Sequence, residues 1–278
     1  AFADIAPVLA SSVGLNDEYK LRNYLAKEYF NSHFKYLMLV GDHDLVPVAY
    51  LCPEPDGFDT VPSDFYFSDL SSLFDTDVDG RLGEYSAAEG MQDWGVDFTP
   101  EVFVGRISSN SADEVSEIAT RIVSFESSNE PYKNKALLPA AFLNYNDEPE
   151  LGMSQTDGAD FMEYAKQTTL RQYETTTMYE QAGVVLSHPC DIDISSTSFN
   201  MQLRDIDYGL INWSAHGSPI SSARKIWIED YNNDNIPDSY EMAWSGLVNL
   251  NSFNDITAEG GSVIFAASCF NGMIDHDV

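Results

Sequence analysis

Two apolar runs in the C-terminal half of the chain each end abruptly at a reactive side chain, a cysteine in one and a histidine in the other. Residues 261–272, GSVIFAASCFNG, end on small side chains around Cys269. Residues 209–218, GLINWSAHGS, end on His216 and Gly217. Short apolar runs of this kind are typical of buried strands in a parallel sheet, where ligands bind at the carboxyl edge. The pattern predicts an α/β fold that presents an imidazole and a thiol at one sheet edge.

A thiol and an imidazole at such an edge suit nucleophilic catalysis. A free cysteine thiol, with a pKa of ~8.5, is mostly protonated near neutral pH, and a neighbouring imidazole stabilises the reactive thiolate. The imidazole then protonates the leaving amine, while the backbone N–H groups of Gly217 and Cys269 are candidates to bind an oxyanion. The alternative is structural: Cys269 as a packed core thiol and His216 as an ordinary strand-end histidine.

Five segments resemble those of one known family. Residues 210–218 and 263–272 are similar to the His-Gly-Ser and Ala-Cys-x-x-Gly segments of gingipain-type cysteine peptidases, which have a caspase-like fold. Upstream, residues 36–47 (YLMLVGDHDLVP), Ser63-Asp64 and residues 100–107 (PEVFVGRI) resemble further segments of that family. The matches follow the family order over most of the chain, so they carry more weight together than singly.

The resemblance implies a three-layer α/β fold of caspase-like type, with a largely parallel sheet and two subdomains side by side. We expect an N-terminal subdomain over residues 1–132, with a calcium-loop-like insertion, and a catalytic subdomain over residues 133–278. In the family, further helices and strands follow the catalytic cysteine, so we expect the catalytic subdomain to be truncated at its C-terminal end.

The same resemblance implies a cysteine endopeptidase that forms an acyl-enzyme on a polypeptide substrate. Cys269 is then the nucleophile and His216 the general acid and base. A sortase-like transpeptidase of the same fold is a related alternative, because an amine can also resolve the acyl-enzyme. A non-catalytic, calcium-stabilised surface or secretion module is an alternative of another class.

The resemblance implies two further roles, a residue that orients the histidine and an acidic residue of the S1 pocket, and each has more than one candidate in this sequence. An acidic residue near the histidine is expected on the loop after a preceding strand, where Asn144, Asp147 and Glu148 are the candidates. An asparagine suits this orienting role in papain-like enzymes. Asp157 or Asp160 lies where arginine-specific members carry the acidic residue of the S1 pocket. Either carboxylate is equally explained by the start of a helix, where the dipole favours negative charge.

Residues 230–241, DYNNDNIPDSYE, match a twelve-residue calcium loop. Asn235 replaces the usual glycine at position 6, and asparagine also tolerates a left-handed turn. A strand precedes the segment instead of a helix, so we expect an isolated loop and no paired EF-hand domain. The alternative is a turn rich in Asp and Asn. The predicted ligands at positions 1, 3, 5, 7, 9 and 12 are Asp230, Asn232, Asp234, the carbonyl of Ile236, Asp238 and Glu241.

A second acidic segment has a weaker calcium pattern. Asp75, Asp77 and Asp79 alternate before a glycine, and Glu84 follows. Position 12 holds Ser86 where the standard loop has a bidentate glutamate, so the segment predicts an irregular calcium site or a solvated acidic turn.

Composition limits the partners and the compartment. The net charge of -31 and the pI near 4.1 argue against binding to nucleic acid or to an anionic membrane. The sequence contains no apolar run long enough to predict a transmembrane helix. It shows no signal peptide and opens without methionine, so we expect a mature or excised piece of a longer protein that is secreted or displayed at the cell surface. Besides Cys269, the sequence has Cys52 and Cys190, expected to be either bridged or buried.

Apolar spacing and capping residues predict the remaining elements. A long decorated loop or hairpin is predicted over residues 51–99. Helices are predicted over residues 16–30, 111–125, 157–170 and 195–205, and strands over residues 36–40, 101–107, 136–143, 173–179, 210–214 and 225–228.

Overall fold

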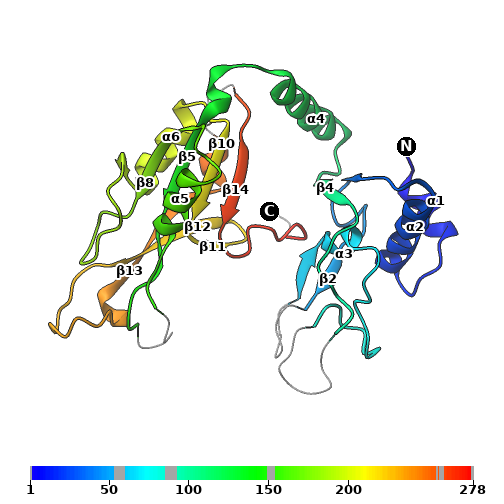
Figure 1. The fold of residues 1–278 in the computed structure, drawn as a ribbon, viewed down its shortest axis with the longest axis horizontal. Coiled ribbons are helices and arrows are strands. Elements are labelled where there is room, and N and C mark those ends of the chain that lie inside the picture. Colours follow the sequence, from blue (N-terminus) through cyan, green and yellow to red (C-terminus); the bar gives the residue numbers. More distant parts are fainter. Residues whose placement is uncertain are drawn as a thin grey trace. The chain divides into compact units, whose positions relative to one another are not determined.

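The chain forms two compact units in the computed structural model (Figure 1). One unit runs to Ala119 and includes a C-terminal piece from Met273, and the other runs from Thr120 to Gly272. The predicted boundary at residue 132 lies inside the second unit. None of the helices that the structure describes is long and apolar enough to cross a membrane. The structure describes residues 2–52, 60–84, 93–148, 154–254, 256 and 260–276.

Helix α2 (Asp17–Ser32) begins and ends where its sequence dictates. The side chain of Asn16 accepts a hydrogen bond from the Tyr19 N–H, and His33 ends the helix in the left-handed conformation, with φ of 49°. Leu21 and Leu25, one turn apart, are buried in the core of the first unit. The other elements of this unit are α1 (Ile5–Ser11), β1 (Tyr36–Val40), β2 (Ala49–Leu51), β3 (Val61–Ser63), α3 (Phe65–Ser68) and β4 (Phe103–Ile107).

Arg106, at the end of β4, connects three distant segments of the first unit. Its side chain is 4% exposed and donates two hydrogen bonds to the carboxylate of Asp64, at 2.8 and 2.7 Å. It also donates to the carbonyls of Gly41, Val46 and Pro47. A guanidinium offers five donors in a fixed fork, so one arginine satisfies all of these acceptors.

A five-stranded parallel sheet forms the centre of the second unit. Its order is β14-β10-β5-β8-β9, which confirms the predicted largely parallel sheet. The predicted strand over residues 136–143 ends earlier, at Ala140, and the chain continues as β6 (Phe142–Asn144). The strands of the sheet are β5 (Lys135–Ala140), β8 (Glu174–Tyr179), β9 (Ile192–Asp193), β10 (Leu210–Ser214) and β14 (Val263–Ala267).

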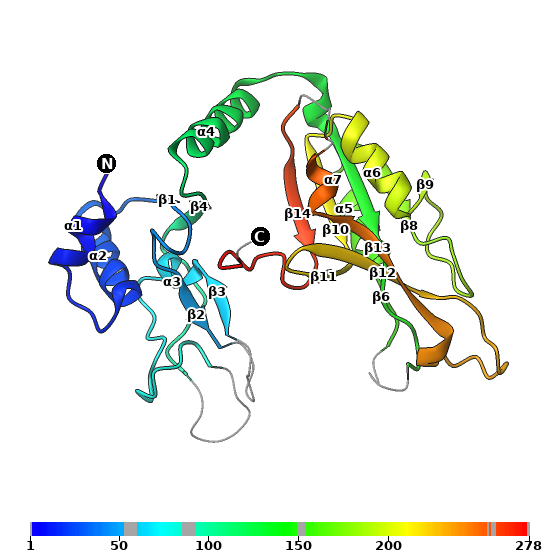
Figure 2. The same cartoon turned by 180° about the vertical axis from the view of Figure 1, so that it is seen from behind.

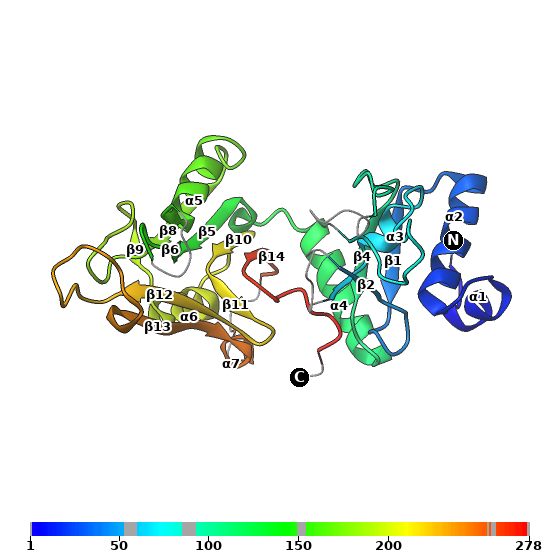
Figure 3. The same cartoon turned by 90° about the horizontal axis from the view of Figure 1, so that it is seen from below.

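Helices α5 (Gly158–Gln167) and α6 (Ser196–Asp205) cover opposite faces of this sheet (Figure 3). Ala136 and Leu138 of β5 pack in one cluster with Met162 of α5, whereas Leu137 packs with Phe199 of α6. Alternate residues of a strand point to opposite faces, so these contacts define three layers. This arrangement confirms the predicted three-layer, caspase-like fold class.

A twisted antiparallel ribbon follows β10 and was only partly predicted. It consists of β11 (His216–Ser218), β12 (Ser221–Trp227) and β13 (Met242–Asn249), of which only part of β12 was predicted. The ribbon carries the 230–241 loop between β12 and β13. The remaining elements are α4 (Ala112–Ser127), which spans the boundary between the two units, η1 (Pro131–Asn134), β7 (Thr156–Asp157), η2 (Ser239–Glu241) and α7 (Leu250–Asn254).

Candidate active site

Strand register brings His216 and Cys269 to the same edge of the sheet. Strands β10 and β14 are parallel neighbours, and Ser214 is opposite Ala267 in their register. His216 and Cys269 each follow this aligned pair by two residues. Because side chains alternate between the faces of a strand, this register predicts that both point to one face. Figure 2 shows β11, which begins at His216, beside the end of β14.

Gly217 lies against the main chain of Cys269. A Cβ atom at Gly217 would lie 2.3 Å from the Cys269 carbonyl oxygen and 2.8 Å from its nitrogen. Neither distance is compatible with a side chain, so this close approach requires glycine. Gly217, which follows His216, is therefore in direct contact with Cys269, although the two residues are far apart in the sequence.

The imidazole of His216 is held by a backbone carbonyl and an indole ring. Its Nε2 lies 2.7 Å from the carbonyl oxygen of Leu143, the middle residue of β6. Since a carbonyl only accepts, Nε2 must carry the proton, and Nδ1 of the neutral ring is then an acceptor. The ring also packs edge-on against Trp244, with centroids 4.7 Å apart. This arrangement fixes both the tautomer and the orientation of the ring.

Burial lowers the pKa of His216 below its usual value, and the positive charge of Lys225 lowers it further. The hydrogen bond to Leu143 and the charge of Glu148 act in the opposite direction, with smaller effects than burial. The neutral imidazole that a general base requires is therefore the favoured form near neutral pH.

We expect His216 to titrate below pH 6.5 in the folded chain. NMR of the ¹⁵N-labelled imidazole in Cys269→Ala, with the urea-unfolded chain as reference, measures this directly. The unfolded state takes up the proton first as pH falls, so this histidine contributes full stability above pH 6.5 and loses it below. A folded-state pKa above the unfolded one would contradict the assigned environment.

Hydrogen bonds anchor the residue before Cys269. The indole Nε1 of Trp213 donates to the hydroxyl of Ser268 at 2.9 Å, and the hydroxyl of Ser222 donates to the same oxygen at 3.2 Å. Cys269 itself is exposed, whereas Cys52 is buried and Cys190 is half-buried, and all three are free thiols. The end of β14 is thus fixed by its neighbours, while Cys269 is exposed.

The three candidate orienting residues have other partners. The Asn144 side chain donates to the carbonyl of Ser154, and Asp147 is exposed and accepts from Asn146. Glu148 is buried, accepting from the Tyr145 N–H at 2.6 Å and forming an ion pair with Lys225. Its negative charge acts on His216, but the imidazole donates its hydrogen bond to the carbonyl of Leu143.

The two candidate S1 carboxylates differ in their environment. Asp157 is buried, caps α5 through the Ala159 N–H and accepts from the hydroxyl of Ser187 at 2.6 Å. Asp160 is exposed in the first turn of α5 and lies 2.7 Å from Nε2 of His188. Asp157 thus has a structural task, whereas Asp160 remains accessible to solvent.

Hydrogen bonds within the 230–241 loop hold several of its carboxylates in place. Asp230 accepts hydrogen bonds from the backbone N–H groups of Asp234 and Asn235, and Asn235 is left-handed, with φ of 60°. Glu241 is fully buried and accepts from the Trp227 indole and the Tyr231 N–H. The other predicted ligands, Asn232, Asp234, Ile236 and Asp238, lie in the exposed or half-buried part of the loop.

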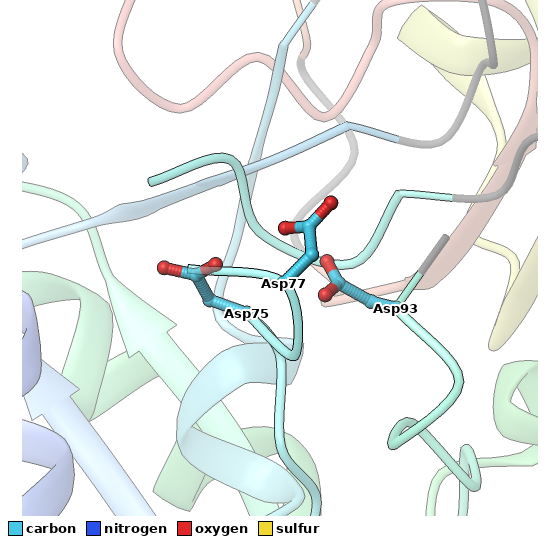
Figure 4. A group of neighbouring side chains, drawn as sticks. All are labelled: Asp75, Asp77 and Asp93. Carbon is cyan, nitrogen blue, oxygen red and sulfur yellow. The ribbon is translucent and has the colours of Figure 1, made fainter. Parts of the chain in front are cut away.

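Asp75, Asp77, Asp79 and Glu84 form one acidic cluster in the first unit, and the structure adds Asp93 to it (Figure 4). Asp93 had no signal in the sequence, because it stands outside the alternating pattern. Ser86, at position 12 of the pattern, lies outside the described residues. Leu143 was also missed, because its contribution is a backbone carbonyl, which any residue type supplies.

Comparison with known proteins places these features in a family. The model of peptidase family C25 matches residues 3–278. The crystal structure of the Arg-specific cysteine proteinase gingipain R (RGPB) superimposes with a TM-score of 0.59 and 17% identity, over 98% of this chain and 49% of that chain. A solved structure described as that of a protease gives 0.56 and 17%, over 97% and 46% of the two chains.

The chain thus spans about half the length of these two proteins, and the likeness to them shows a shared fold. No curated protein sequence matches the chain. The family match runs over nearly the whole sequence, so the chain belongs to peptidase family C25.

Proposed function

We propose that this chain is the catalytic part of a cysteine endopeptidase, with Cys269 as nucleophile and His216 as general acid and base. The close approach of Gly217 to the Cys269 main chain supports this most strongly, because it joins the imidazole and thiol segments at one edge. The family match supports the same reaction class.

In the proposed reaction, each step is carried out by a group at this sheet edge. His216 accepts the thiol proton at Nδ1 while the carbonyl of Leu143 holds Nε2–H, and the thiolate attacks the peptide carbonyl. The backbone N–H groups of Gly217 and Cys269 stabilise the oxyanion. The imidazolium then protonates the leaving amine, and water hydrolyses the thioester with His216 again as base.

A peptidyl chloromethyl ketone tests this function, because it alkylates a cysteine only when peptide binding and thiolate activation coincide. We expect stoichiometric modification of Cys269 and loss of casein hydrolysis. Modification of Cys52 or Cys190 instead, or none, would favour the non-catalytic surface module. An added amine separates hydrolysis from transpeptidation: a dominant amide product would assign the sortase-like reaction.

We also propose that the 230–241 loop binds calcium as a structural cofactor. Two observations support this: its backbone N–H groups already orient the Asp230 carboxylate, and the loop concentrates oxygen ligands. Calcium loops of this kind suit extracellular ion concentrations, so we propose a secreted or cell-surface location.

Removing calcium should loosen this loop. Tyr231 and Tyr240 are exposed within it, so chymotrypsin should cleave there faster in EGTA than in calcium. Calcium at 100 times its Kd should stabilise the folded chain by about 2.7 kcal/mol. Asp230→Asn is the matched variant and should cleave at the EGTA rate in both buffers. Equal cleavage of the wild-type chain in both buffers would refute a metal role for this loop.

A further inference from the structure

Trp244 presents a large indole to solvent beside the imidazole of His216. It lies in β13, is 61% exposed, and packs edge-on against that imidazole with ring centroids 4.7 Å apart. Most exposed apolar side chains on a protein surface stand alone and need no explanation. This indole differs from them, because it touches the proposed general acid and base, which the substrate must approach closely.

Strand register places the indole and the imidazole on the same face of the antiparallel ribbon. His216 is opposite Ala223 in the pairing of β11 with β12. Trp244 is opposite Lys225 in the pairing of β12 with β13. Ala223 and Lys225 are two residues apart in β12, so their side chains point to the same face. The contact between Trp244 and His216 is therefore a diagonal cross-strand contact that follows from the backbone pairing.

Lys225 restrains the indole through a cation–π contact. Its Nζ lies 5.9 Å from the centre of the Trp244 ring. The same ammonium group forms an ion pair with Glu148, a buried carboxylate that also accepts a hydrogen bond from the Tyr145 N–H. An aromatic ring that is already restrained loses little conformational entropy when it contacts a ligand. Trp244 is thus suited to bind a substrate side chain.

The chemistry of the proposed reaction indicates which part of a substrate reaches Trp244. His216 protonates the leaving amine, so the nitrogen of the scissile bond lies within hydrogen-bond reach of the imidazole during that step. The residues that follow this nitrogen form the leaving peptide, and the first of them lie beside the imidazole and the side chains in contact with it. A large apolar side chain there is stabilised by covering the exposed indole.

We propose that Trp244 is a specificity-determining residue that binds a large apolar side chain in the first two positions after the scissile bond. This assignment rests on the proposed peptidase function and adds a substrate class to it, namely peptides with aromatic or other large apolar residues on the leaving side. The S1 pocket receives the side chain before the scissile bond, so the subsite at Trp244 is separate from it.

Two internally quenched peptides test this assignment in the full chain. They share the residues before the scissile bond, taken from the best substrate in a fluorogenic library, and carry either two phenylalanines or two glycines after it. We expect the wild-type chain to cleave the phenylalanine peptide with a kcat/KM about tenfold higher. Trp244→Ala should bring this ratio to within about twofold of one, whereas Trp244→Phe, which keeps an aromatic ring, should retain most of the preference. A merely structural defect would lower kcat/KM for both peptides alike and leave the ratio unchanged.

Trp94→Ala is the matched control and should leave the ratio unchanged, because Trp94 is 84% exposed and belongs to the first unit. An unchanged ratio in Trp244→Ala, an equal fall in Trp94→Ala, or no preference for phenylalanine in the wild-type chain would overturn the assignment. If Trp244→Ala does not fold by far-UV circular dichroism, Trp244→Gln decides, because it removes the ring but keeps a long side chain.

Labelling of Cys269 by a peptidyl chloromethyl ketone separates this assignment from the proposed function. The peptide part of the reagent occupies only positions before the scissile bond, so its reaction does not depend on Trp244. A labelled Cys269 with an unchanged ratio would refute the role of Trp244 alone. An unlabelled Cys269 together with two uncleaved peptides would refute both.

Discussion

Replacing Cys269 by alanine should lower kcat/KM for peptide hydrolysis by at least ~10³-fold, the largest effect expected at any position. The variant retains the imidazole, the oxyanion N–H groups and the substrate contacts, but it cannot form the acyl-enzyme. Hydrolysis of a fluorogenic peptide library, with the chain at matched concentration, measures the loss.

Cys190→Ala and Cys52→Ala are the matched controls. Cys190 is half-buried, and its Sγ donates to the carbonyl of Ile192 at 3.2 Å. Cys52 is buried in the first unit. Both variants should keep activity within a few-fold once corrected for the folded fraction. Activity of Cys269→Ala at more than a tenth of the wild-type value would eliminate this thiol as the nucleophile.

Gly217→Ala should have the second-largest effect, a fall in kcat/KM of ~10²-fold or more. The added methyl would lie 2.3 Å from the Cys269 carbonyl oxygen and 2.7 Å from Cβ of Ser268. Because Trp213 and Ser222 hold Ser268 by hydrogen bonds, the strand end cannot yield without losing them. The nucleophile and its oxyanion N–H must therefore move away from His216.

Gly246→Ala is the control for Gly217→Ala. Gly246 lies in β13, and a Cβ there meets no atom within 4 Å. Comparing kcat/KM and urea midpoints of the two variants separates local displacement of the site from general loss of stability. Equal kcat/KM values for the two variants would contradict the close approach of Gly217 to Cys269.

The parts of the fold that depend on local apolar pattern were predictable. Strand β14 is a continuous apolar run, β10 is mostly apolar, and α2 has a capping asparagine and helical spacing, so sequence alone located them. The expectation that the β14 segment is buried was wrong, because β14 is an edge strand and most of its residues are exposed. Three motif segments of the first unit were recognisable by resemblance. The structure gives a physical reason for their association, because Arg106 binds Asp64 and the carbonyl of Gly41.

The parts that depend on tertiary contacts were not predictable. The carbonyl that orients His216 comes from Leu143, which has no sequence signature, and the ion pair of Glu148 with Lys225 joins residues far apart in the chain. Strand β13 pairs with β12 across the 230–241 loop, and its alternation is too weak to identify it alone. Asp93 joins the acidic cluster although it stands apart from the other four carboxylates in the sequence.

The rate of iodoacetamide alkylation of Cys269 at pH 6, measured by peptide mapping in the wild-type chain and in His216→Ala, tests the central claim most directly. If the imidazole and the sulfur meet at the sheet edge, His216 takes the proton from the thiol as the sulfur attacks, and the variant should react roughly tenfold more slowly. Equal rates in the two proteins would show that His216 does not activate this thiol.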